Sequence, residues 1–207
     1  MLFRSLRALL EECGPHRLVG EDLGVVPDYV RPCLARLGIA GFKIPYWEPE
    51  GHGPMTPGAD YPRLAATTYA THDFEPLCAL WDSWMAKIEA AEAGGPETHA
   101  ARDAAWRDVR RLAAWAGFDV PHITPYSAEV HERLLRALFA SNAWLAIYMI
   151  TDLFASSQRF NVPGAISESN WSQRLNTPIH AWRDDAELAE KMARIGEVIR
   201  ATGRTRA

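Results

Sequence analysis

Apolar residues along this chain alternate between helical spacing and short continuous runs. Leucines at helical spacing predict a first helix over residues 2–12, which Gly14 ends. The same spacing predicts further helices over about residues 27–37, 80–88, 100–116 and 127–142. Four short apolar runs, at residues 17–19, 39–44, 64–69 and 144–150, have the length of buried strands. Strands and helices are therefore expected in alternation.

This alternation predicts the fold class. Short, almost continuous apolar strands separated by helices are typical of a parallel sheet covered by helices, which is the α/β class. Four strands are about half of an eight-stranded (β/α)8 TIM-type barrel, and such barrels usually need about 250 residues, whereas this chain has 207. We expect residues 1–207 to be part of one barrel domain, with a helical insertion over about residues 85–142.

Polar side chains follow the predicted strands, where a barrel places its active site. These strand ends carry Glu21-Asp22, Lys43, His72-Asp73 and Asp152. Carboxyl groups on two strand ends, such as Glu21 and Asp73, suit the cleavage of a glycosidic bond, which needs one proton donor and one ionised carboxylate. His72 could donate a hydrogen bond to a sugar hydroxyl beside them.

A simpler interpretation of the strand-end acids is structural. Asp22 and Asp73 could cap the helices that follow or pair with arginine, and the residues alone leave both interpretations open. The eight tryptophans of the chain are similarly ambiguous, because indole rings fill protein cores as well as pack against sugar rings. Core packing is the more common use.

Composition excludes several classes of protein. The net charge is −4 and no sustained basic cluster exists, so we expect no nucleic-acid and no membrane partner. His52, His72, Asp73 and Glu75 lie in one stretch without a recognised metal-ligand spacing, so we expect no metal and no cofactor. The chain has no G-x-S-x-G sequence, which argues against a serine hydrolase.

The cysteines indicate the compartment. Cys13, Cys33 and Cys78 are odd in number and have no C-x-x-C spacing, which is typical of free thiols in a reducing environment. Residues 1–10 lead into Glu11 without a small-residue cleavage site, so they predict a helix and not a signal peptide. A cytoplasmic location is expected.

Several segments, in order along the chain, resemble the 4-alpha-glucanotransferases, the amylomaltase or disproportionating-enzyme family. These segments are GEDLGVVP at residues 20–27, GFKI at 41–44, TYATHD at 68–73, ITDLF at 150–154, RFNVPG at 159–164 and NWSQRL at 170–175. The resemblance implies that the chain is the C-terminal half of the catalytic (β/α)8 barrel. One departure is Phe74-Glu75-Pro76, which stands where family members commonly have a short polar or acidic run.

The resemblance also implies residue roles. Glu21 is expected to be the general acid/base, and Asp73 the carboxylate that stabilises the transition state by binding ring hydroxyls. His72, Asn161 and Lys43 are expected to bind substrate. Trp171 is a further candidate for binding, although the Asn-Trp pair of such enzymes could serve mainly to fix its loop.

The implied reaction moves a segment of an α-1,4-glucan donor to glucose or a maltooligosaccharide acceptor by a retaining double displacement. The family's nucleophilic aspartate lies on the strand before the acid/base residue, where this chain has only a helix. We therefore expect a partner, the N-terminal half of the barrel, to supply it. Two alternatives are a non-catalytic carbohydrate-binding fragment and an α-amylase-type hydrolase.

Overall fold

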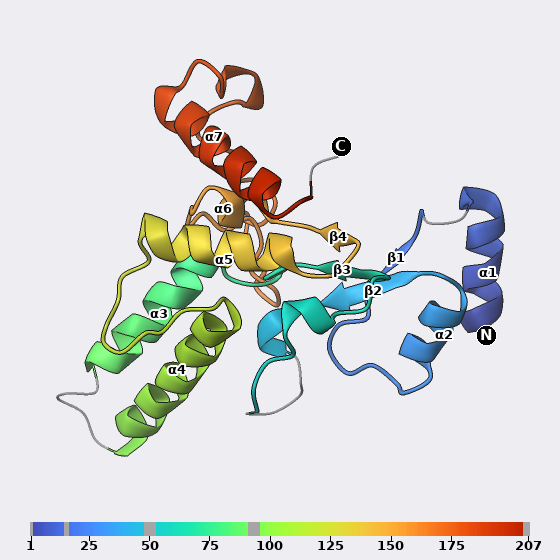
Figure 1. Ribbon diagram of the computed structural model, residues 1–207, viewed down its shortest axis with the longest axis horizontal. Helices are drawn as coiled ribbons and strands as arrows, with labels where there is room; N and C mark the ends of the chain where they lie inside the picture. The colour runs from blue at the N-terminus through green and yellow to red at the C-terminus, as the bar shows by residue number, and fades with distance from the viewer. Residues whose placement is uncertain (1, 15–16, 48–52, 91–95, 205–207) are drawn as a thin grey trace.

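The structure is a computed structural model that describes residues 2–14, 17–47, 53–90 and 96–204. A parallel four-stranded sheet lies at its centre, with the strands in chain order from one edge to the other (Figure 1). The strands are β1 (Val19–Gly20), β2 (Ala40–Lys43), β3 (Ala65–Thr67) and β4 (Leu145–Ala146). The predicted α/β class and the four parallel strands are confirmed.

The strands are shorter than the apolar runs that predict them. Parallel pairing continues past their ends, because Thr68 N donates to Lys43 O (3.2 Å) and Ile147 N donates to Thr67 O (2.8 Å). The prediction of a strand through Ile150 is wrong at its end, because Ile150 begins a short helix, α6 (Ile150–Leu153). The carboxylate of Asp152 in that helix accepts a hydrogen bond from Leu77 N, which connects α6 to the start of α3 (Leu77–Ala90).

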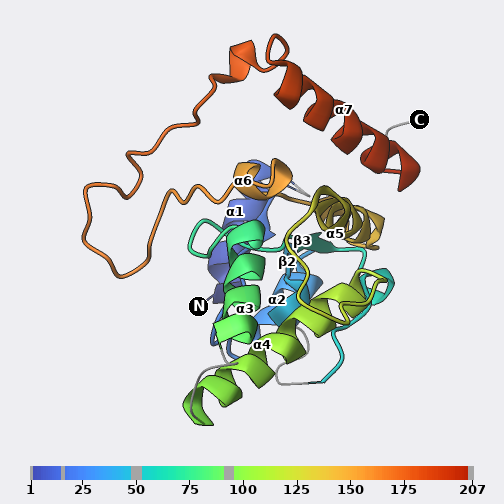
Figure 2. The ribbon, with the colours of Figure 1, turned by 90° about the vertical axis from the view of Figure 1, so that its left-hand side faces the viewer.

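Helices separate the strands as the pattern predicts. Helices α1 (Leu2–Cys13) and α2 (Val30–Arg36) flank β1, while α3 (Leu77–Ala90), α4 (Pro96–Trp115) and α5 (Ala128–Ala140) lie between β3 and β4. Figures 1 and 2 show α3 and α4 side by side, with α5 lying beside β3 and β4. Most of residues 85–142 are thus helical, and their status as an insertion stays a prediction.

The main core lies among α3, α4 and α5. Trp81, Leu112, Leu134 and Leu138 are completely buried there, and Trp84 packs in the same cluster. Burying an indole N–H requires an acceptor, and Trp81 Nε1 donates to the main-chain oxygen of Thr124 (2.8 Å). For these two tryptophans the core interpretation is correct.

The last part of the chain was not predicted from its pattern. From residue 154 to residue 178 it forms no helix or strand, and Figure 2 shows this segment swinging away from the helices before it returns to α7 (Ala186–Ala201). We call residues 154–178 the C-terminal loop. Helix α7 packs against α5 through Ile195 and Val198, which contact Leu135 and Phe139.

Short 3₁₀ helices complete the fold, at Pro45–Trp47, Gly58–Asp60 and Ile179–Ala181. Among the described residues, no helix combines the length and the apolar character needed to span a bilayer.

Candidate active site

The two carboxylates predicted to act together, Glu21 and Asp73, line one cleft at the carboxyl ends of β1 and β3. The cleft has a volume of about 640 Å³. Its other lining residues are Leu23, Gly24, Trp47, Thr71, Phe74 and Pro163. Parallel strands end at the same edge of the sheet, which is why residues 52 positions apart in the chain share this cleft.

The neighbour of Glu21 fixes the loop that presents it. Asp22 is buried, and its carboxylate accepts hydrogen bonds from Phe42 N (2.6 Å) and from Arg31 Nε (3.2 Å). A Cβ atom on Gly41 would lie 2.8 Å from Asp22 Oδ1, so glycine at position 41 leaves room for the Asp22 carboxylate. The structural interpretation is therefore correct for Asp22, while Glu21 beside it is exposed to the cleft.

Asp73 is held by residues of the C-terminal loop. Its Oδ1 accepts a hydrogen bond from Asn161 Nδ2 (2.8 Å) and lies 3.3 Å from His72 Nε2. Arg159 donates to the main-chain oxygen of Asp73 (2.9 Å) rather than to its carboxylate. About half of the Asp73 side chain stays exposed, so its carboxylate is accessible from the cleft.

His72 and Trp171 meet beside the cleft. Their ring centroids are 5.0 Å apart, and both line an adjoining hollow of about 260 Å³. Phe74 lines this hollow as well as the cleft, so the two spaces are neighbours. The Trp171 side chain is 59% exposed, and its backbone has a φ of 62°, a left-handed conformation that is uncommon outside glycine.

Asn170 fixes the chain around these rings. Its side chain donates to the main-chain oxygens of Val162 (3.2 Å) and Ala165 (2.9 Å) and accepts from Val162 N (3.0 Å). Trp171 N donates to Phe160 O (2.8 Å). The asparagine of the Asn-Trp pair thus holds the loop, and the exposed indole is free to contact a ligand.

Lys43 lines neither the cleft nor the adjoining hollow. It ends β2, and its main-chain oxygen accepts from Thr67 Oγ1 (2.9 Å). The residues that line the cleft of Glu21 and Asp73 do not include Lys43. Its assignment to substrate binding stays a prediction.

Three residues of the site have no role predicted from the sequence. Trp47 and Phe74 form an aromatic pair on the cleft wall, with ring centroids 4.6 Å apart. Arg159 links Asp73 to the loop of Asn161. The sequence held partial signals, because Phe74 directly follows Asp73 and Arg159 opens the RFNVPG segment.

Asp152 has a structural place outside the cleft. It is 1% exposed, and its Oδ1 accepts a hydrogen bond from Leu77 N (2.6 Å) at the start of α3. Burial raises the pKa of this carboxyl group to about 6. Its Oδ2 has no hydrogen-bond partner among the described residues.

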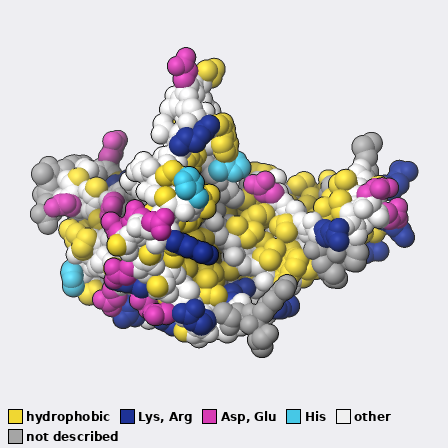
Figure 3. All heavy atoms as spheres, turned by 90° about the horizontal axis from the view of Figure 1, so that it is seen from above, with side chains coloured by type: hydrophobic (Ala, Val, Ile, Leu, Met, Phe, Trp, Pro, Cys, Tyr) yellow, Lys and Arg dark blue, Asp and Glu magenta, His cyan; other side chains and the backbone are white. Residues whose placement is uncertain are grey.

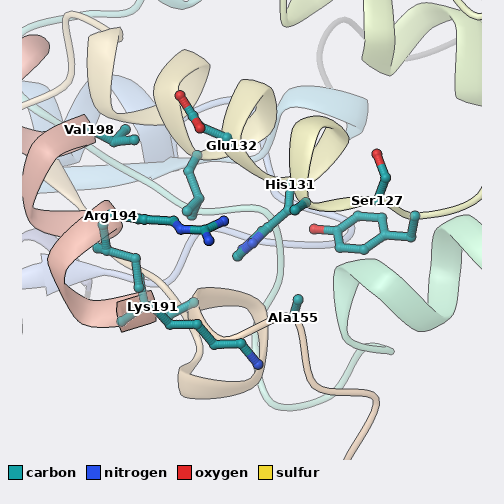
Figure 4. Close-up of a pocket in the computed structure, with 12 residues that line it drawn as sticks. Ser127, His131, Glu132, Ala155, Lys191, Arg194 and Val198 are labelled. Atoms are coloured by element: carbon teal, nitrogen blue, oxygen red, sulfur yellow. The ribbon is translucent and has the colours of Figure 1, made fainter. Parts of the chain in front are cut away.

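A separate cavity of about 200 Å³ lies among α5, α6 and α7. Figure 4 shows Arg194 reaching from α7 toward His131 of α5. The apolar residues that line this cavity include Leu135 and Ile195. None of the predicted site residues lines this cavity. Burial lowers the pKa of His131, whose Nε2 lies 2.9 Å from the main-chain oxygen of Asp152.

In the described part of the chain, no group of three His, Cys, Asp or Glu side chains is placed to hold a metal ion. Of the residues considered for such a site from the sequence, His52 lies outside the described residues. The arrangement of Glu21, Asp73, Asn161 and His72 instead suits acid/base chemistry on a polyhydroxylated ligand.

Known proteins that are similar to this chain come from one family. Residues 2–180 match the family model described as 4-alpha-glucanotransferase. The chain is 31% identical over 174 residues to the 4-alpha-glucanotransferase of Chlamydia caviae, covering 78% of this chain and 28% of that protein. It is 32% identical over 163 residues to the enzyme of the same name from Chlamydia pneumoniae, covering 76% of this chain and 28% of that protein.

Solved structures share the fold. The amylomaltase from Streptococcus agalactiae, solved in complex with acarbose, superposes with a TM-score of 0.63 at 20% identity, over 99% of this chain and 35% of that one. The amylomaltase from Corynebacterium glutamicum gives the same TM-score over 88% of this chain and 28% of that one. The chain therefore has the fold of part of a barrel and spans about a third or less of the relatives it matches.

Proposed function

This chain belongs to the 4-alpha-glucanotransferase family, and from that membership we propose that the protein it represents transfers a segment of an α-1,4-glucan to the 4-hydroxyl group of glucose or of another α-1,4-glucan. One observation carries the proposal: Glu21 and Asp73 line the same cleft. The chain spans about 28% of its curated relatives, so the activity is proposed for a protein that contains the whole barrel.

In this proposal Glu21 is the general acid and base. It donates a proton to the leaving glycosidic oxygen, and it later removes the proton of the acceptor 4-hydroxyl group. A retaining reaction also needs a carboxylate nucleophile, which forms a covalent glycosyl intermediate. We assign that nucleophile to the N-terminal half of the barrel, which is the partner of residues 1–207.

Asp73 acts on the transition state. Positive charge develops on the sugar ring as the glycosidic bond breaks, so an ionised carboxylate that binds ring hydroxyl groups contributes most at that point. The hydrogen bond from Asn161 Nδ2 to Asp73 Oδ1 supports this role, because it holds one carboxylate oxygen and leaves the other to the cleft. His72 lies beside this pair and is assigned to a sugar hydroxyl group.

The outer glucose units are assigned to the remaining predicted residues. Trp171 presents an exposed indole next to His72, which suits contact with the apolar face of a sugar ring. Lys43 is retained as a binding residue on its strand-end position alone. The helical segment over about residues 85–142 is proposed as an insertion in the same barrel domain.

A cytoplasmic location is proposed from the cysteines. Cys13, Cys33 and Cys78 are free, and burial raises the pKa of the Cys78 thiol, which keeps it protonated and unreactive. The two alternative functions are not favoured, because the matching relatives carry the name 4-alpha-glucanotransferase.

The test is Glu21→Gln in a polypeptide that contains the complete barrel. The amide keeps the shape of the side chain but cannot transfer a proton, so the conversion of maltotriose to glucose and longer glucans should fall by about 10²- to 10⁴-fold. Glu97→Gln is the matched control, because Glu97 is an exposed glutamate in the first turn of α4. Near-normal conversion by Glu21→Gln would remove the assignment, and release of glucose without longer glucans by the unmodified protein would indicate a hydrolase.

A further inference from the structure

Arg159 ties two distant segments of the chain together at the cleft. One guanidinium nitrogen donates to the main-chain oxygen of Asp73 (2.9 Å), 86 residues away, and Nε donates to the main-chain oxygen of Asn161 (2.8 Å). The remaining nitrogen lies 3.8 Å from Glu75 Oε1. The planar guanidinium thus joins the loop after β3, through Asp73 and Glu75, to the C-terminal loop, where it also bonds Asn161.

The two main-chain groups that Arg159 holds belong to the partners of one hydrogen bond. Asn161 Nδ2 donates to Asp73 Oδ1 over 2.8 Å, and Asn161 is buried. The direction in which the Asp73 carboxylate points therefore depends on how these two main chains are placed. Arg159 sets that placement, since its two hydrogen bonds end on the same two residues.

Arg159 acts at a distance from the reacting atoms. It lines the hollow shared by His72 and Trp171, and it is not among the residues that line the cleft of Glu21 and Asp73. Glu75, its carboxylate neighbour, belongs to the Phe74-Glu75-Pro76 segment that directly follows Asp73. The contact therefore links this segment to the C-terminal loop.

We propose that Arg159 is a positioning residue for the transferase reaction, which orients the Asp73 carboxylate by fixing the main chain of Asp73 against Asn161. The inference rests on the proposed function. A carboxylate displaced by about 1 Å can cost about 10²-fold in rate even when substrate still binds. The defect of an Arg159 variant should therefore appear in kcat and leave KM within about threefold of normal.

A double-mutant cycle in the complete-barrel protein tests this. Arg159→Ala and Asp73→Asn should each lower kcat for maltotriose disproportionation, Arg159→Ala by about 10- to 100-fold. If Arg159 acts through Asp73, the double variant should match Asp73→Asn alone within about twofold, because the interaction lost is the same. The proposal would be overturned if Arg159→Ala lowered kcat equally in the unmodified protein and in the Asp73→Asn variant, or if Arg159→Ala alone had a normal kcat.

Two further variants separate positioning from folding and from charge. Arg159→Lys keeps the charge but cannot make both directional bonds. Its loss of kcat should therefore be at least half of the loss that Arg159→Ala causes, and a normal rate would refute the role of the guanidinium. If Arg159→Ala does not fold, the cycle is run with Arg159→Lys. Arg136→Ala is the control, because Arg136 is an exposed arginine paired with Glu132 on α5. If the unmodified protein does not produce glucans longer than maltotriose, that result would instead contradict the proposed function itself.

Discussion

At the scale of single residues, the burial of Asp152 links stability to pH. Burial raises the pKa of its carboxyl group from 3.8 to about 6 in the folded protein, and the unfolded chain restores the lower value. The folded state therefore binds the proton more tightly, and the stability gained is fully present below about pH 4 and lost as the pH rises through about 6. The size of this loss is on the order of 3 kcal/mol.

Asp152→Asn should remove this dependence. The amide oxygen can still accept the hydrogen bond from Leu77 N, and the group no longer ionises. Relative to that of the unmodified protein, the free energy of unfolding of the variant should rise between pH 4 and pH 6, by up to about 3 kcal/mol. Above that range the difference between the two proteins should stay constant.

Urea unfolding at several pH values measures this difference. Asp103→Asn is the control, because Asp103 is a largely exposed aspartate on α4. A constant difference between Asp152→Asn and the unmodified protein from pH 4 to pH 7 would contradict the shifted pKa.

The sequence predicted the acids of the cleft but not the contacts that orient them. Strand-end position alone singles out Glu21 and Asp73, because the barrel geometry places such residues together. The partners of Asp73 come from 86 and 88 residues away, and no local pattern encodes a contact at that separation. Asn161 was predicted only through the family resemblance, and Arg159 was not assigned a role.

At the scale of elements, the apolar runs predicted all four strands and their parallel order, but not where each strand ends. The apolar run from residue 144 to residue 150 looks continuous, although its last residue begins α6. The contact that α6 makes through Asp152 is with the distant Leu77, and no local pattern encodes it. Helix α7 has a local start signal, because Asp185 caps it and the Asp185 side chain accepts a hydrogen bond from Leu188 N (3.1 Å). Its docking on α5 has no such signal.

Arg204 anchors α7 to the end of α5. Its guanidinium donates to the main-chain oxygens of Ser141 (2.6 Å), Ala143 (2.8 Å) and Phe139. These carbonyl groups follow or end α5, where a helix leaves oxygens without intrahelical donors. Arg204 therefore supplies hydrogen-bond donors to the carbonyl groups at the end of α5.

Arg204→Ala should loosen α7 at a cost of about 1.5 to 3 kcal/mol, because hydrogen bonds from a charged group are lost and their acceptors stay partly buried. The measurement is amide hydrogen exchange, in which residues 186–201 should lose protection before α5 does. Arg200→Ala, an exposed arginine in the last turn of α7, provides the comparison. Unchanged protection of α7 in Arg204→Ala would show that the apolar face of α7 is enough to hold it on α5.

At the scale of the whole molecule, the sheet has two edges in the described residues, β1 and β4. Apolar side chains next to these edges are exposed, among them Val19, Trp144 and Ile147. Figure 3 shows hydrophobic side chains exposed across the middle of one face of the molecule. A sheet edge beside such a surface is a template for pairing with another chain.

We expect residues 1–207 alone to self-associate and to lack transferase activity, and the N-terminal half of the barrel to restore both a defined mass and activity. Light scattering on the purified chain, with and without that half, measures the association, and maltotriose conversion measures the activity. A monodisperse, cooperatively melting monomer that disproportionates maltotriose would contradict this expectation and would place the nucleophile within these 207 residues.

The close approach of Gly41 to the Asp22 carboxylate has a consequence for the history of the family. A side chain at position 41 would collide with Asp22, and a smaller residue at position 22 would leave Phe42 N and Arg31 without their acceptor. Neither position can change alone without loss, so descendants of this sequence should keep the pair or replace both together. Residue 21 would then keep the same supporting contacts in related proteins, even where other residues of the cleft change the substrate preference.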